Sequence, residues 1–75
     1  MFVVLINGDR LYQNVCTDDV QLFKGHDDRL GHWDSRFPSR LSAVEALEIR
    51  LTDIRASLRM GADWDQMTIE IKLIP

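Results

Sequence analysis

The sequence predicts a small α+β domain in which one long helix packs on one face of a mainly antiparallel sheet of three to four strands. Three segments lead to this prediction: an apolar run at residues 2–6 followed by Asn7-Gly8, a capped helical pattern at residues 42–60, and an alternating pattern at residues 67–74. The predicted order is strand, strand, a further strand in an ambiguous middle, helix and strand. A helix laid across such a sheet buries every apolar stripe of the chain.

The first two strands are predicted to form a hairpin. Residues 2–6 are apolar at every position, which is typical of a central strand covered on both faces. Asn7-Gly8 is the strongest short signal for a tight turn, because a type I′ turn needs positive φ at both central residues. Residues 11–15 are therefore expected to return beside the first strand.

The middle of the chain, residues 17–25, is open to two interpretations. Thr17-Asp18-Asp19 is either a turn that leads into a short strand from Val20 to Phe23, or the start of a short helix. In the second case Thr17 is the N-cap, the two acids lie in the first turn and Gly25 ends the helix. The local sequence favours neither.

The long helix is expected at about residues 42–60. Ser42-Ala43-Val44-Glu45 matches a capping box, in which Ser42 is the N-cap and Glu45 reaches back to it. Gly61 stands where a left-handed C-cap is expected. The apolar residues that recur at helical spacing are Val44, Leu47, Leu51, Ile54 and Leu58.

The last strand is predicted from strict alternation between residues 67 and 74. Met67, Ile69, Ile71 and Leu73 share one side, and polar residues occupy the other. This pattern predicts a sheet with one covered face and one wet face.

Length and composition predict a single domain, residues 1–75, with a thin core. Cys16 is the one cysteine, so no intrachain disulfide is possible, and a reducing cytoplasm is the expected location. The apolar N-terminal run is too short to span a bilayer, so no membrane association is expected. The net charge of −3 disfavours a general affinity for nucleic acid, although six of the arginines lie within residues 29–59.

The segment GHDDRLGHWDSRF, residues 25–37, holds both histidines of the chain beside three aspartates. Imidazole and carboxylate are zinc ligands, so His26 and His32 are weak candidates for a metal site. Their spacing matches no recognised metal motif and no cysteine joins them. A solvated loop is the favoured interpretation, and no cofactor is predicted.

No catalytic signature occurs in the chain, which has no nucleophile elbow, phosphate-binding glycine loop or dinucleotide fingerprint. Protein recognition fits the remaining residues best, because Trp and Arg dominate interface hot spots. The predicted partner-binding residues are Arg29, Trp33, Asp34, Arg36, Arg40 and Trp64.

The leading hypothesis is therefore a non-catalytic intracellular binding module that occupies a surface of a larger protein or nucleoprotein complex. Small acidic chains of this type resemble inhibitors encoded by phages and other mobile elements, of the anti-CRISPR or anti-restriction type, and this is an analogy of kind only. One alternative is a nucleic-acid-associated regulatory protein that uses the Arg29–Arg40 segment, with Trp33 and Phe37 stacking on bases. A second alternative is an accessory subunit or a homodimeric module.

Overall fold

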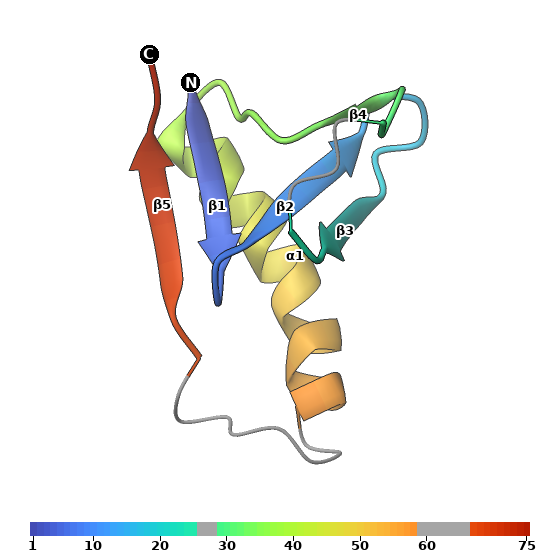
Figure 1. The fold of residues 1–75 in the computed structure, drawn as a ribbon, viewed down its shortest axis with the longest axis vertical. Helices are drawn as coiled ribbons and strands as arrows, with labels where there is room; N and C mark the ends of the chain where they lie inside the picture. Colours follow the sequence, from blue (N-terminus) through green and yellow to red (C-terminus); the bar gives the residue numbers. More distant parts are fainter. Residues whose placement is uncertain (26–28, 59–66) are drawn as a thin grey trace.

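The computed structural model describes residues 1–25, 29–58 and 67–75, and it shows an antiparallel sheet with one helix (Figure 1). The predicted α+β class is confirmed. The element order agrees with the prediction except for one additional short strand before the helix, so the sheet has five strands where three to four were predicted. The elements in chain order are β1 (Phe2–Ile6), β2 (Asp9–Asn14), β3 (Val20–Phe23), β4 (Trp33–Asp34), α1 (Arg40–Leu58) and β5 (Ile69–Leu73). The predicted C-cap at Gly61 lies outside the described residues.

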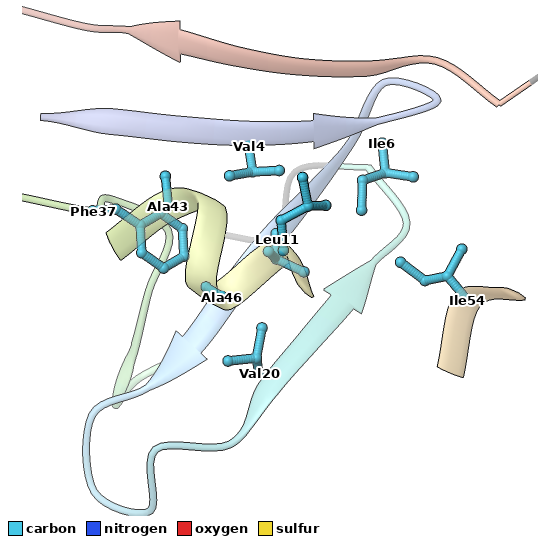
Figure 2. Packing of buried hydrophobic residues seen from close by; sticks show 9 residues of the cluster. Val4, Ile6, Leu11, Val20, Phe37, Ala43, Ala46 and Ile54 are labelled. Carbon is cyan, nitrogen blue, oxygen red and sulfur yellow. The ribbon is translucent and has the colours of Figure 1, made fainter. Parts of the chain in front are cut away.

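The sheet has the strand order β3-β2-β1-β5, with β4 attached to β2. β1 is central, as its continuous apolar sequence predicts. Val4 and Ile6 point toward α1 (Figure 2). Val3 points to the opposite side, because side chains alternate along a strand, and all three residues are at most 1% exposed. The side of the sheet that carries Val3 is called the distal face below.

The Asn7-Gly8 turn joins β1 to β2 as predicted, with φ angles of 52° at Asn7 and 82° at Gly8. Asn7 also ties this turn to the chain that leads into β5. Its side-chain Oδ1 accepts a hydrogen bond from the backbone N–H of Thr68 at 2.8 Å, and its own N–H donates to the Thr68 carbonyl at 2.9 Å. One residue therefore fixes the same end of three neighbouring strands.

The ambiguous middle of the chain forms a strand. β3 pairs with β2 in antiparallel register, and the Asn14 N–H donates to the Asp19 carbonyl at 2.7 Å where the hairpin closes. Asp18 adopts a left-handed φ of 59° in the connection. A helix over these residues would leave the edge of β2 unpaired, whereas a strand satisfies its backbone groups.

β1 and β2 pair next to their turn, at Ile6 with Asp9 and at Leu5 with Arg10, and then diverge (Figure 1). The gap between the diverging strands is closed by residues 33–37, here called the bridging segment. These are the last five residues of the histidine-containing stretch GHDDRLGHWDSRF.

The bridging segment pairs with both diverging strands. At one end Trp33 and Asp34 form β4 against Asn14 and Gln13 of β2. At the other end Phe37 exchanges two backbone hydrogen bonds with Phe2 of β1, at 2.7 and 2.8 Å. The segment therefore belongs to the sheet and is not a free loop.

The main core lies between the sheet and α1 (Figure 2). Phe37 is the largest fully buried side chain and lies beside Ala43 of α1. The buried residues of this cluster are Val4, Ile6, Leu11, Val20, Phe37, Ala43, Ala46, Leu47 and Ile54. The bridging segment thus supplies an essential part of the core as well as a backbone connection.

The start of α1 differs from the prediction, because the N-cap is Ser39 and not Ser42. The N–H of Ser42 donates to Ser39 Oγ at 3.1 Å, and the N–H of Ser39 donates to Ser42 Oγ at 3.2 Å. Ser42 thus takes the position that Glu or Gln holds in the usual capping box. Beginning one turn earlier also brings Arg40 and Leu41, which favour helix, into the helix.

The buried stripe of α1 is also rotated relative to the prediction. Ala43, Ala46, Leu47 and Ile54 are buried, whereas the predicted Val44 and Leu51 are half-buried. Small alanines at the contact allow the helix backbone to approach the sheet closely. Leu58 was predicted to continue the stripe, and its side chain lies outside the described set.

Several apolar side chains of α1 and β5 lie outside the core and are exposed to solvent. In the described residues, Leu41 and Ile49 lie on the solvent side of α1, and Ile69 and Leu73 of β5 are exposed as well. No described helical segment has the length and apolar character that crossing a membrane requires.

Replacing Asn7 tests its double role in the turn. Asn7→Gly keeps the positive φ and loses the bond to Thr68, so the free energy of unfolding should fall by about 1 kcal/mol. Asn7→Ala loses the same bond and also places in the left-handed region a residue that adopts it less readily than asparagine, which should cost about 1 kcal/mol more. Urea unfolding measures both, and equal losses in the two variants would contradict this account.

The position of the N-cap is tested by Ser39→Ala. Loss of the capping oxygen should lower the free energy of unfolding by about 1 kcal/mol. Thr52→Ala is the control, because Thr52 is exposed in the middle of α1 and alanine favours helix. An unchanged urea midpoint for Ser39→Ala would show that the cap contributes nothing.

Candidate functional site

The described members of the predicted partner-binding set lie in the chain between β3 and the first turn of α1. Arg29 precedes the turn in which the Trp33 N–H donates to the Leu30 carbonyl at 2.7 Å. Trp33, Asp34 and Arg36 belong to the bridging segment, and Arg40 opens α1. Trp64 and His26 lie outside the described residues.

Trp33 is half-buried and forms one end of a row of aromatic side chains. Its ring centroid lies 5.2 Å from that of Phe23, with the planes at 80°. Phe23 in turn lies 5.4 Å from Tyr12, at 84°. Both are edge-to-face contacts, an arrangement that the ring quadrupoles favour. The three residues are called the aromatic row below.

The aromatic row lies on the distal face. Asn14 pairs with Trp33 and Arg10 pairs with Phe23, and both stand two residues from Tyr12, so strand alternation places all three rings on one side. Val3 shares this face and is buried outside the helix-side cluster. The distal face therefore has its own small apolar layer.

The burial of the distal face changes from its centre to its margin. Tyr12 is only 5% exposed, whereas Leu5, Phe23 and Trp33 are half-buried and Gln21, which pairs with Tyr12, is exposed. The margin of the distal face therefore combines half-buried rings with an exposed polar residue.

Asp34 and Arg36 form an ion pair within the bridging segment. Asp34 Oδ1 accepts from the Arg36 backbone N–H at 2.9 Å and from Arg36 Nε at 3.2 Å. Because side chains alternate along a strand, Asp34 points away from the face that carries Trp33. The structure therefore separates Trp33 from the Asp34–Arg36 pair.

The Asp34–Arg36 pair fixes the direction of the guanidinium group while leaving it accessible, since the Arg36 side chain is 59% exposed. Such an exposed pair adds little to stability, of the order of 0–1 kcal/mol. Arg29 and Arg40 are also exposed. The chain between β3 and the start of α1 therefore carries three exposed arginines.

Phe37 does not belong to any binding surface. Its side chain is 1% exposed within the core, so it cannot stack on a nucleic-acid base. His32 is exposed, and the part of the chain that the structure describes contains no group of three or more metal-ligating side chains. The nucleic-acid hypothesis used Trp33 and Phe37 as stacking residues, and the burial of Phe37 excludes it from that role.

Tyr12 and Phe23 were not predicted as members of the site. One signal was available for Tyr12: Leu11 and Tyr12 are adjacent large apolar residues in one strand, so they must point to opposite faces. Both are buried, which shows that β2 is covered on both sides. The contact with Trp33 had no such signal, because it joins three separate segments.

Comparisons of the chain with protein-family models, with curated proteins and with solved structures found no match.

Proposed function

We propose that this protein is a non-catalytic binding module that occupies a surface of a larger protein or nucleoprotein complex. The observation that carries the proposal is Trp33, whose ring is held edge-on by Phe23 while part of it remains accessible. A large side chain that is already fixed loses little conformational entropy on binding. Rigid Trp side chains of this kind are typical interface hot spots.

The margin of the distal face is the proposed contact surface. Trp33 and Phe23 supply apolar area, and Gln21 supplies an exposed polar rim. The exposed Arg36 belongs to the same bridging segment as Trp33 but lies outside this face. A partner with an apolar pocket for the indole ring and acidic groups toward Arg36 would match this arrangement. An inhibitor of the type that phages and other mobile elements encode is one form that such a module takes.

Direct nucleic-acid binding is the alternative proposal, and the geometry supports it less. Tyr12 is buried and the rings of the aromatic row pack against one another, so they do not form separate stacking platforms. The chain also carries a net charge of −3.

The proposed surface is tested by two variants and one control in affinity capture from cells of the source organism, with mass spectrometry before and after nuclease treatment. Trp33→Ala should weaken capture of the protein partner by more than about tenfold, because it removes the anchor. Gln21→Arg should weaken it too, because it adds a bulky charge to the exposed margin. Circular dichroism verifies that both variants are folded.

Thr52→Arg is the matched control for Gln21→Arg, since both replace an exposed polar residue and Thr52 lies on α1, on the other side of the sheet. The control should capture the partner as the unaltered protein does. Capture that disappears on nuclease treatment would favour the nucleic-acid alternative. A protein partner retained equally by all variants would contradict the assignment to the distal face.

A further inference from the structure

The outer edge of β5 is a strand edge with no strand beside it in the part of the chain that the structure describes. β5 ends the strand order, and its pairing is with β1. Exposed strand edges present unpaired N–H and C=O groups and are templates for pairing with another strand.

The backbone of β5 directs alternate residues toward this open edge. The N–H of Ile74 donates to the Met1 carbonyl at 2.9 Å, and the carbonyl of Thr68 accepts from Asn7 at 2.9 Å. The even-numbered residues of β5 therefore direct their backbone N–H and C=O groups toward β1. Because the direction of the backbone groups alternates along an antiparallel strand, Ile69, Ile71 and Leu73 direct their N–H and C=O groups toward the open edge.

The apolar side chains of these residues are exposed at Ile69 and Leu73 and half-buried at Ile71. They pair with Ile6, Val4 and Phe2 of β1, so their side chains lie on the face that α1 covers. The cover is incomplete at this edge, since Ile69 is 40% and Leu73 is 65% exposed. The other edge strand, β3, differs, because Val20 is buried and Leu22 is half-buried.

The sequence of β5, Ile-Glu-Ile-Lys-Leu, is complementary to itself when two copies run antiparallel about Ile71. In that register Glu70 of one copy stands opposite Lys72 of the other, and Ile69 stands opposite Leu73. The apolar pairs share one face and the opposite charges share the other. Cross-strand pairs of both kinds stabilise a sheet.

The hydrogen-bond directions agree with this register. Ile71 meets Ile71 of the second copy, and Ile69 meets Leu73, so every outward N–H finds an outward carbonyl. Glu70 of one copy and Lys72 of the other then form the non-hydrogen-bonded pairs of the ladder, in which the two facing side chains lie closer together. A shift by one residue would place Glu70 opposite Ile71, and the two faces would no longer match.

We propose that two copies of this chain associate through β5, forming one continuous antiparallel sheet across a two-fold axis centred on Ile71. A two-fold interface brings the same patch of both copies together, and β5 is complementary to itself in charge, apolar pattern and backbone direction. One short strand per copy buries less area than a standard interface, so the dimer dissociates in the micromolar to millimolar range. This inference is independent of the proposed function, because it concerns the purified chain alone.

Sedimentation equilibrium of charge variants at low ionic strength tests the register. Glu70→Lys places two lysines opposite each other at both symmetric positions, and Lys72→Glu does the same with glutamates. Each should raise the dimer dissociation constant by about tenfold. The double variant Glu70→Lys/Lys72→Glu restores opposite charges and should return the constant to within about threefold of the original.

An equimolar mixture of the two single variants should form a heterodimer, because one edge is then wholly positive and the other wholly negative. Glu48→Lys, which makes the same change in net charge on the exposed side of α1, should leave the dissociation constant unchanged. Leu73→Pro removes an outward N–H near the end of β5 and should weaken the dimer without disturbing the ladder to β1.

Two results would overturn the proposal. One is a monomer at all concentrations up to about 1 mM, a range that covers the weakest specific association expected of so small an interface. The other is a dimer whose dissociation constant is the same in both single variants. That outcome would place the contact on another surface.

Discussion

The rest of the structure depends on the bridging segment, which closes the gap between β1 and β2. At one end it extends the ladder of β2, and at the other Phe37 exchanges two backbone hydrogen bonds with Phe2. The same residue places the largest fully buried side chain of the protein against α1. Without this segment the backbone groups of two diverging strands would face the core unpaired, at a cost of about 1–3 kcal/mol for each group.

This constraint also connects the fold to the candidate site. Because Trp33 and Phe37 belong to one short segment with backbone bonds at both ends, fixing Phe37 in the core fixes Trp33 at the margin of the distal face. Phe23 then holds the indole ring edge-on. The proposed anchor is thus a consequence of core packing, whereas the self-complementary edge of β5 lies on the other side of β1 and is independent of it.

The sequence predicts well whatever local chemistry determines. Asn7-Gly8 requires a tight turn, the alternation around Ile71 requires a strand, and both are observed. The predicted N-cap of the helix was wrong by three residues, because Ser39 and Ser42 both fit a capping motif. The reciprocal hydrogen bonds between these two serines, which form only in the folded chain, make Ser39 the N-cap. The pairing of Phe2 with Phe37 and the contacts of the aromatic row join residues distant in the chain, and no local pattern specifies them.

Amide hydrogen exchange under native conditions tests the central claim, that the bridging segment is an integral part of the sheet. The measurement compares the backbone N–H groups of Phe2 and Phe37 with that of Leu5, which belongs to the ladder between β1 and β5. If the segment holds the sheet together, all three open in the same global event, and their protection factors agree within about tenfold. Rapid exchange of Phe2 and Phe37 while Leu5 remains protected would show that the segment opens freely, and would contradict this account.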